Sequence, residues 1–335
     1  MTAGPIVCFG EIMLRLAAPG RGHLLQEARL DATFGGAEAN VAVALARIGV
    51  PAAFVTALPD GPLGEAALDS VRRAGVDATG VVRRAGRLGL YFLSPGAGPR
   101  AASILYDRAD SVFAQTPSAA YDWPRLLAGA RWLHLSGIIP ALGPEAARLS
   151  LDAIAAAREA GVRVSFDGNY RASLWARWCA DPAPILAEHV AGADLLFGSH
   201  RDVSLLLGTP FAGDGPERRR EAALAAFERF PTLRAIASTA RHLVTAETHR
   251  LSARVDRRDD AHETAEVEVA GIVDRIGTGD AFAAGVLARL DDGPEAAASA
   301  GLALAALNHA TFGDQSFTTA DEMDAFEAGV LDVRR

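Results

Sequence analysis

Short apolar runs alternate with alanine-rich stretches along most of the chain, and this alternation restricts the fold more than any other feature. The apolar runs, each about as long as a buried strand, are 5–13, 52–58, 130–138, 162–168, 193–199 and 233–239. The alanine-rich stretches with helical periodicity include 38–49, 64–75, 143–161 and 219–230. Such an alternation is typical of parallel β-α-β units with helices on both faces of a sheet. The sequence therefore predicts an α/β fold with a mostly parallel central sheet.

Two segments near the front of the chain, roughly 12–34 and 86–112, break this rhythm. They alternate polar and apolar residues or carry Pro/Gly turns, as antiparallel strands do. We predict that they form a small antiparallel β lid inserted in a single domain, 1–335, because no linker or repeat divides the chain. Residues 251–270 are predicted to add two strands around a charged turn. Three predicted helices stop at glycines that fit left-handed caps, Gly49, Gly75 and Gly161.

The charge and the cysteines restrict the partners and the compartment. The formal net charge of -8 argues against nucleic acid as a partner, but a small anionic ligand needs only a local pocket. Cys8 and Cys179 lie far apart, which suggests a reducing compartment. The N-terminus lacks the features of a signal peptide, and no run approaches the roughly 18 apolar residues of a membrane span. We therefore expect a cytoplasmic protein without a membrane partner.

The chain contains no lysine, so arginine supplies all 33 of its cationic side chains. A Walker A loop, a Schiff-base lysine and the ion pair of protein kinases each require lysine and are excluded. If the protein uses ATP, it must bind the phosphates in another way.

The segment GTGD at 277–280 stands where a predicted helix begins. The first turn of a helix has free backbone N–H groups, and glycines let a ligand approach them closely, so the loop can form an anion hole. A carboxylate at Asp280 could accept the proton of a hydroxyl that attacks phosphorus. The alternative is an aspartate that only caps the helix. A dinucleotide-binding G-x-G-x-x-G reading fails, because Phe282 stands where the third glycine is needed.

Residues 274–285, DRIGTGDAFAAG, resemble the signature D-x-x-G-A-G-D-x-F-x-x-G of the ribokinase-like carbohydrate kinases, the PfkB family. The residues that match it are Asp274, Gly277, Gly279, Asp280, Phe282 and Gly285. Two further matches, the family's glycine pair before a helix and its strand ending in Gly-Glu, comprise Gly35, Gly36, Asn40, Gly10 and Glu11. The resemblance covers essentially the whole chain. It implies a ribokinase-like three-layer α/β/α fold, ATP and Mg²⁺ as cofactors, and a sugar as the phosphoryl acceptor.

The resemblance also implies roles for individual residues. Gly277, Thr278, Gly279 and Asp280 would be catalytic, and Gly277 and Gly279 would also contact ATP. Gly35, Gly36 and Asn40 would bind sugar hydroxyls. The segments 133–142, 167–175 and Y-x-R at 106–108 are similar to 2-keto-3-deoxygluconate kinases. That similarity implies ATP-dependent phosphorylation of the terminal hydroxyl, giving 2-keto-3-deoxy-6-phosphogluconate.

Several polar residues in these segments are candidates for binding the acceptor. They are Tyr91, Tyr106, Arg108, Asn169 and Arg171. The planar fork of an arginine matches a carboxylate, so a pair of arginines favours a sugar acid over a neutral sugar. The alternatives are that Arg108 and Arg171 pair with protein acids such as Asp107 or Asp110, or bind nucleotide phosphate.

The chain departs from the family pattern near the expected nucleotide site. The N-x-x-E motif that organises Mg²⁺ through water is replaced by Ser199 and Asp202. Thr239 is present in the strand near the nucleotide, but the glycines that usually follow are missing and Arg241 stands nearby. We assign Ser199, Thr239 and Asn308 to the nucleotide, and Asp202 to indirect metal binding. His309 is interpreted as a core residue at a helix end.

Other functions remain open at this point. Within the family, the acceptor could be fructose, ribose or 5-keto-2-deoxygluconate. The chain could also be a catalytically silent sugar-acid sensor, although such a protein would not need Asp280. Because exposed strand edges tend to be paired or covered, we expect the lid to join subunits in a homo-oligomer.

Overall fold

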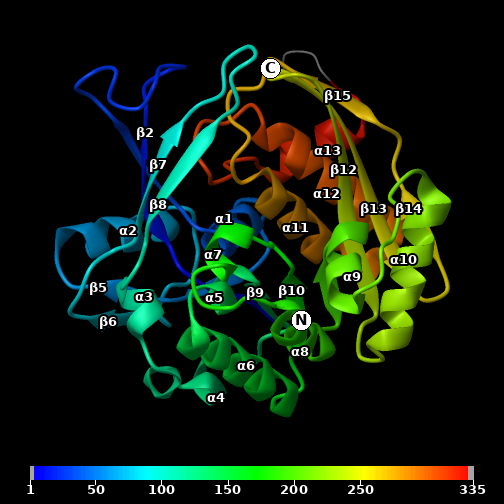
Figure 1. The fold of residues 1–335 in the computed structure, drawn as a ribbon, viewed down its shortest axis with the longest axis horizontal. Coiled ribbons are helices and arrows are strands. Elements are labelled where there is room, and N and C mark those ends of the chain that lie inside the picture. Colours follow the sequence, from blue (N-terminus) through cyan, green and yellow to red (C-terminus); the bar gives the residue numbers. More distant parts are fainter. Residues whose placement is uncertain (1–3, 331–335) are drawn as a thin grey trace.

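The computed structural model describes residues 4–330 and shows a large mixed sheet between two layers of helices (Figure 1). Within the described residues the sheet has nine strands in the order β14-β13-β12-β11-β10-β9-β1-β4, and β15 also pairs with β13. Their bounds are β1 (Ile6–Phe9), β4 (Ala52–Val55), β9 (Trp132–Ser136), β10 (Arg163–Asp167), β11 (Leu195–Phe197), β12 (Ala235–Thr245), β13 (Thr248–Arg257), β14 (Ala261–Glu263) and β15 (Val267–Ala270). The strands from β4 to β12 pair in parallel, as the sequence predicts.

The antiparallel end of the sheet differs from the prediction. β12 continues past residue 239 and pairs with β13 in a long hairpin, from Ala235 opposite Arg257 to Thr245 opposite Thr248. The segment predicted to hold two strands, 251–270, instead takes part in β13, β14 and β15. Residues 240–245 are mostly exposed, so they lack the apolar run by which the earlier part of β12 is recognised.

The central strands are buried on both faces, because each face carries its own hydrophobic core. In β1, Ile6 and Cys8 belong to one core, whereas Val7 and Phe9 belong to the other. The first core is covered by α1 (Ala37–Arg47), α2 (Pro62–Arg72), α11 (Thr278–Arg289), α12 (Pro294–Asn308) and α13 (Ala320–Glu327). The second is covered by α3 (Val112–Gln115), α4 (Trp123–Leu126), α5 (Ile138–Ala141), α6 (Pro144–Glu159), α7 (Ala172–Trp175), α8 (Ala183–Ala191), α9 (His200–Leu207) and α10 (Pro216–Arg229). This is the predicted three-layer α/β/α arrangement.

Glycines end several of these helices in the left-handed conformation. Gly49, Gly75 and Gly161 have φ angles of 81°, 91° and 70°, which confirms the predicted caps. No helix in the described part of the chain combines the length and apolarity needed to cross a membrane.

A smaller sheet lies above one end of the central sheet (Figure 1). In the described chain it comprises four strands in the order β3-β2-β7-β8, with β2 (Met13–Ala17), β3 (Asp31–Gly35), β7 (Leu90–Ser94) and β8 (Ser103–Asp107). The outer pairs are antiparallel, but the middle pair, β2 with β7, is parallel. We call this sheet the lid. The short strands β5 (Ala57–Pro59) and β6 (Val82–Arg84) form a separate parallel pair.

Candidate active site

The N-terminus of α11 lies where two cavities of the described chain meet. Gly277 precedes the helix with a φ of 81°, a conformation that glycine adopts at little cost. A Cβ at Gly277 would stand 1.9 Å from the carbonyl oxygen of Asp314, so no other residue fits there. Thr278 and Gly279, in the first turn, line both cavities. The loop thus presents its free backbone N–H groups to both cavities, as an anion hole for phosphoryl transfer requires.

The first cavity, of about 320 Å³, lies between the lid and the carboxyl ends of the parallel strands. We call it the acceptor cavity. Most of the residues predicted to bind the acceptor line it, namely Gly36, Asn40, Tyr91, Tyr106, Arg108, Asn169 and Arg171, as do the catalytic candidates 277–280. Gly35 is not among the lining residues. It packs against Asp314 instead, where a Cβ would stand 2.2 Å from Oδ2.

Asp280 projects from the first turn of α11 and is held by Asn40. The side-chain amide of Asn40 donates a hydrogen bond of 2.7 Å to Oδ2 of Asp280, and its oxygen accepts one of 3.3 Å from the Gly36 amide. Burial raises the pKa of Asp280 to about 6, against the lowering effect of the Asn40 bond. Asn40 was predicted to bind a sugar hydroxyl; it lines the acceptor cavity, and its side-chain amide also binds the carboxylate of Asp280. The arrangement suits a carboxylate that accepts a proton near neutral pH.

Four further carboxyl groups line the acceptor cavity, those of Glu11, Glu38, Asp167 and Asp314. Burial raises the pKa of Asp167 to about 8, and the nearby charge of Asp280 adds to this effect. Burial likewise raises the pKa of Glu38 to about 7, and Glu38 accepts a hydrogen bond of 2.6 Å from the Ser136 hydroxyl. The sequence analysis overlooked Glu38. The signal for it was an acidic residue in the first turn of an otherwise apolar helix.

The two candidate arginines differ in the structure. Arg108 is 3% exposed and forms an ion pair with Glu11, in which Nε, at 2.8 Å, and Nη2 both donate to the same oxygen, Oε2. Its charge is therefore already balanced, although by Glu11 and not by Asp107 or Asp110. Arg171 donates a hydrogen bond of 3.1 Å to the carbonyl of Tyr170, and within the described residues no carboxylate forms an ion pair with it. Arg171 is thus an available cation of this cavity, as is Arg275, which also lines it and has no ion pair among the described residues.

Tyr91 and Asp314 connect the acceptor cavity to the lid. The Tyr91 hydroxyl donates a hydrogen bond to Oδ2 of Asp314. The other oxygen of Asp314 accepts a hydrogen bond of 2.7 Å from Arg15, a lid residue that also pairs with Asp274. Arg15 and its contact with the signature residue Asp274 were not predicted from the sequence.

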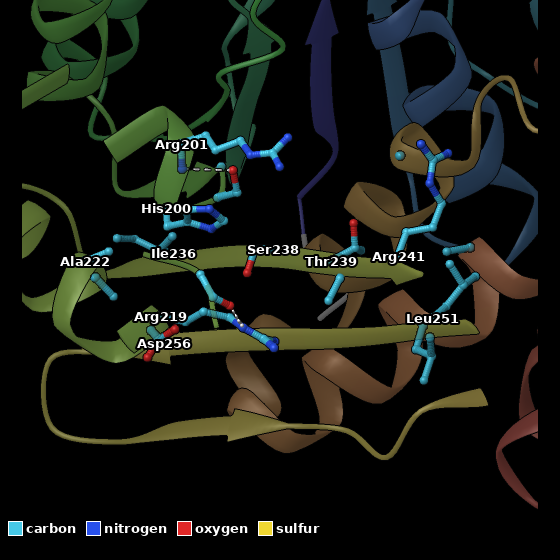
Figure 2. A pocket seen from close by; sticks show the side chains of 18 of the residues that line it. His200, Arg201, Arg219, Ala222, Ile236, Ser238, Thr239, Arg241, Leu251 and Asp256 are labelled. Carbon is cyan, nitrogen blue, oxygen red and sulfur yellow. Dashed lines mark hydrogen bonds between the residues drawn. The ribbon is translucent and has the colours of Figure 1, made fainter. Parts of the chain in front are cut away.

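The second cavity, of about 640 Å³, lies between α9, α10, α12 and the hairpin of β12 and β13. We call it the nucleotide cavity. Figure 2 shows Ser238, Thr239 and Arg241 along β12, with His200 and Arg201 opposite them. Ser199 and Thr239 line it as predicted, but Asn308 does not. Asn308 is fully buried and donates a hydrogen bond of 3.2 Å to the carbonyl of Ile276, so it supports the loop that leads to the anion hole.

Arg241 is one of the arginines that line the nucleotide cavity, with Arg201 and Arg219. Desolvation and the neighbouring charge of Arg275 lower its pKa. Among residues 4–330 it has no ion pair with a carboxylate, so its charge is available to a ligand. Its neighbour in the cavity, His309, is 1% exposed at the end of α12, as expected for a core residue, but it also lines the cavity wall. The glycine loop and Arg241 together fit the polyphosphate of a nucleotide.

Ser199 and Asp202 form a capping box at the start of α9. Oδ2 of Asp202 accepts hydrogen bonds of 2.7 Å from the Ser199 amide and 2.9 Å from its hydroxyl. The described residues contain no group of three or more His, Cys, Asp or Glu that could hold a metal ion. A magnesium ion would therefore take most of its ligands from phosphate and water, and Asp202 could act only through its remaining capacity.

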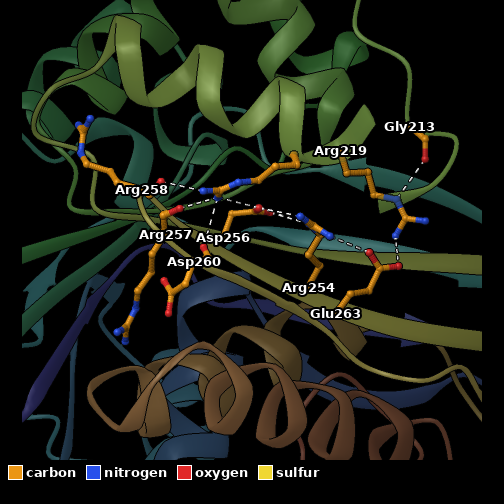
Figure 3. Close-up of polar contacts among 9 residues, drawn as sticks. Gly213, Arg219, Arg254, Asp256, Arg257, Arg258, Asp260 and Glu263 are labelled. Atoms are coloured by element: carbon orange, nitrogen blue, oxygen red, sulfur yellow. Dashed lines mark hydrogen bonds and ion pairs between the residues drawn. The ribbon is translucent and has the colours of Figure 1, made fainter. Parts of the chain in front are cut away.

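An ionic network fixes the far wall of the nucleotide cavity (Figure 3). Arg254 on β13 bridges Asp256, with Nε 2.7 Å from Oδ2, and Glu263, at 3.0 Å. Arg219 of α10 binds Glu263 at 2.6 Å and the carbonyl of Gly213 at 3.1 Å. Because Arg219 and Asp256 both line the cavity, the network holds α10 against the edge strands at a fixed distance.

A glycine loop at a helix N-terminus beside a buried carboxylate, on this fold, suits the transfer of a phosphoryl group to a hydroxyl. The chain belongs to the pfkB family of carbohydrate kinases, whose family model matches residues 4–321. It is a sugar kinase, as the sequence predicts.

Individual relatives point to sugar acids. The structure of a 2-dehydro-3-deoxygluconokinase from Thermotoga maritima superposes with a TM-score of 0.92 at 35% identity and covers 97% of this chain and 98% of that one. A 2-dehydro-3-deoxygalactonokinase from Haloferax volcanii is 34% identical over 329 residues, which cover 97% of this chain and 96% of the relative. A 2-dehydro-3-deoxygluconokinase from Bacillus subtilis is 30% identical over 296 residues, 86% and 83% of the two chains. The chain is therefore similar to kinases of six-carbon 2-keto-3-deoxy acids, which are named 2-dehydro-3-deoxy acids in these relatives.

Proposed function

We propose that the protein phosphorylates 2-keto-3-deoxygluconate at its terminal hydroxyl, with ATP as the donor. The observation that carries this proposal is that Arg171, an available cation, and Asp280, the proposed base, line the same cavity of about 320 Å³. An arginine binds a carboxylate as a bidentate fork, so Arg171 would hold the acid end of the substrate. The hydroxyl at the other end would then lie at Asp280, next to the anion hole.

In the proposed reaction, Asp280 accepts the proton of the terminal hydroxyl as its oxygen attacks the γ-phosphorus of ATP. The bond between the γ-phosphorus and the β–γ bridging oxygen breaks, and ADP leaves. Asn40 keeps the carboxylate oriented toward the acceptor. The amides of residues 277–279 and the dipole of α11 stabilise the negative charge on the transferring phosphoryl group. These terms are the main requirements of phosphoryl transfer, in which positioning and charge stabilisation dominate.

Kinases of this family use ATP, and we propose that the nucleotide cavity binds it here. Ser199, Thr239, Arg241, Gly277 and Gly279 would contact the nucleotide. Magnesium would supply charge neutralisation between the phosphates, and Asp202 would contact it only through water. Because no lysine is present, Arg241 is the cation that we assign to the phosphates.

We assign Arg108 to the cavity wall and not to the carboxylate of the substrate. Its ion pair with Glu11 places both groups on the wall of the acceptor cavity, where Arg108 would orient the Tyr106 ring beneath its guanidinium, 5.8 Å from the ring centroid. We propose that Tyr91, Tyr106 and Asn169 contact the middle of the substrate, and that Gly36 admits it close to the backbone. Arg171 then remains the main carboxylate ligand.

A coupled ADP-release assay with ATP and magnesium tests the proposal. The acceptor panel would contain 2-keto-3-deoxygluconate, its galactonate epimer, 5-keto-2-deoxygluconate, fructose and ribose. Turnover confined to the 2-keto-3-deoxy acids would support it, and the ratio between the epimers would separate the gluconate activity from the galactonate activity named in the relatives above. Turnover with neutral sugars alone would contradict the arginine assignment. Binding of a sugar acid without turnover would identify a sensor.

We further propose that the chain works as one domain and assembles through its lid, in the cytoplasm where ATP is supplied. The edge strand β8 carries Ile104 and Leu105, which are 37% and 62% exposed. Exposed apolar edges of this kind are usually covered by another chain. Light scattering at micromolar concentration, compared with the variant Leu105→Glu, would test this. A monodisperse wild-type monomer would contradict it.

A further inference from the structure

The lid carries a buried arginine, Arg15, in direct contact with the loop that forms the anion hole. Its side chain is 1% exposed and pairs with Asp274 and Asp314, which lie 259 and 299 positions further along the chain. We propose that Arg15 is a positioning residue for phosphoryl transfer, whose fixed positive charge holds the loop 274–280 in its anion-binding shape. This rests on the kinase reaction of the family but not on the identity of the acceptor.

Arg15 reaches the loop through Asp274. Arg15 binds Oδ2 of Asp274, and Oδ1 of the same carboxylate accepts the amides of Arg275 and Ile276, at 2.7 and 3.1 Å. These amides directly precede Gly277, the glycine with a positive φ at the start of α11. The orientation of the Asp274 carboxylate therefore fixes the backbone that enters the hole, and Arg15 fixes that orientation.

Arg15 also reaches the loop through Asp314. Its carboxylate binds Arg15, and its backbone oxygen packs so closely on Gly277 that no Cβ fits between them. The same carboxylate accepts the Tyr91 hydroxyl from the wall of the acceptor cavity. Arg15 thus contacts both residues that shape the loop, and through Asp314 it links the loop to the acceptor side.

Arg15 also balances the charges of two carboxylates. Asp274 and Asp314 are two buried carboxylates beside a site that must accept a phosphoryl group, and like charges at such short range repel. Burial lowers the pKa of Arg15, but the charges of Asp274 and Asp314 outweigh this effect and raise it, so the guanidinium stays charged. Without Arg15, both carboxylates would repel each other and the incoming phosphate.

The competing explanation is that Arg15 only fastens the lid to the rest of the protein. The two explanations differ in what restores activity after the side chain is removed. A fastening role depends on the covalent link between the guanidinium and β2, whereas a positioning charge can be supplied by a free cation. Arg15, Asp274 and Phe312 also line a third cavity, of about 620 Å³, by which a small cation can reach the site.

The experiment compares Arg15→Ala with wild type, using whichever acceptor the wild type phosphorylates. We expect kcat to fall roughly 10²–10³-fold, as on loss of other groups that stabilise transition-state charge. KM values for both substrates should change less than about threefold. Millimolar guanidinium chloride should restore kcat at least about tenfold, whereas tetramethylammonium chloride at equal ionic strength should not. The matched control is Arg87→Ala, an exposed arginine shortly before β7 that binds Asp107 of β8, which should retain wild-type kcat.

Thermal unfolding of each variant shows whether it is folded. If Arg15→Ala does not fold, Arg15→Lys and Arg15→Met replace it, since they have similar length and differ in charge. The lysine variant should then exceed the methionine variant in kcat by about tenfold or more. The proposal would be overturned if the kcat of Arg15→Ala stayed within about threefold of wild type, or if guanidinium did not restore the lost kcat. Equal kcat values of the lysine and methionine variants would also overturn it, as would unfolding of all three variants.

Discussion

Asn40 donates a hydrogen bond of 2.7 Å to Asp280, although 240 positions separate the two residues in the chain. Asn40 lies in the first turn of α1 and Asp280 in the first turn of α11, so the contact joins the amino ends of two packed helices. A hydrogen bond to the charged form of a carboxylate favours that form. The contact therefore controls both the direction and the proton affinity of the proposed base.

The first prediction concerns the base itself. Asp280→Asn keeps the size of the side chain but removes its ability to accept the proton, so kcat should fall about 10²–10⁴-fold. Binding of acceptor and nucleotide, measured by calorimetry, should stay within about threefold of wild type, because the cavity keeps its shape. A variant that retains most of its kcat would exclude Asp280 as the general base.

The second prediction concerns pH. Because burial raises the pKa of Asp280 to about 6, the carboxyl stays protonated and inactive below that pH. The kcat/KM for the acceptor should therefore rise with pH through about 6 and then level off. In Asn40→Ala the charged form loses its hydrogen bond, so the rise should move to higher pH. An unchanged profile in that variant would contradict the orienting role of Asn40.

The third prediction separates the two arginines of the acceptor cavity. Arg171→Ala should raise the KM for a 2-keto-3-deoxy acid by roughly tenfold or more, since a charge-assisted bidentate contact is lost, and change that for any neutral acceptor much less. Arg108→Ala should instead destabilise the protein, because it leaves Glu11 buried without its partner. The control is Arg177→Ala, an exposed neighbour outside the cavity. Equal effects of Arg171→Ala on acidic and neutral acceptors would refute the carboxylate assignment.

The fourth prediction concerns the nucleotide. Arg241→Ala should raise the KM for ATP several-fold and leave the KM for the acceptor unchanged, because Arg241 lines only the nucleotide cavity of the pair. The matched control is Arg250→Ala, an exposed arginine of the adjacent strand that pairs with Glu266. Initial rates at varied ATP would measure both variants. An ATP KM equal to that of wild type would remove Arg241 from the phosphate site.

The sequence was sufficient for much of the fold and for the place of the glycine loop at the start of α11, because both depend on local patterns. The buried strands are continuous apolar runs, and the loop is a compact motif within ten residues of the chain. The partner of Arg108 shows the limit. The sequence analysis considered Asp107 and Asp110, which are near in the chain, whereas the structure pairs Arg108 with Glu11, 97 positions away. Pairing between distant elements leaves no periodic trace that a single sequence can show.

The burial of Arg15 was not predicted, for a related reason. On an alternating lid strand, an arginine at this position is typical of a solvent-exposed face. It is buried because the segment around Asp314, near the other end of the chain, packs over it. The long hairpin of β12 and β13 was likewise recognised only where it enters the core, since its outer half is exposed and polar.

The parallel pairing of β2 with β7 has a consequence for how the protein folds. A parallel pair cannot close through a short turn, and here α1, β4 and α2 lie between the partners Leu14 and Leu90. The lid can therefore be completed only after that intervening unit has brought its two ends together, so its closure carries the loop entropy of a long chain segment. The acceptor cavity, whose wall includes this lid, can form only once that intervening unit is in place.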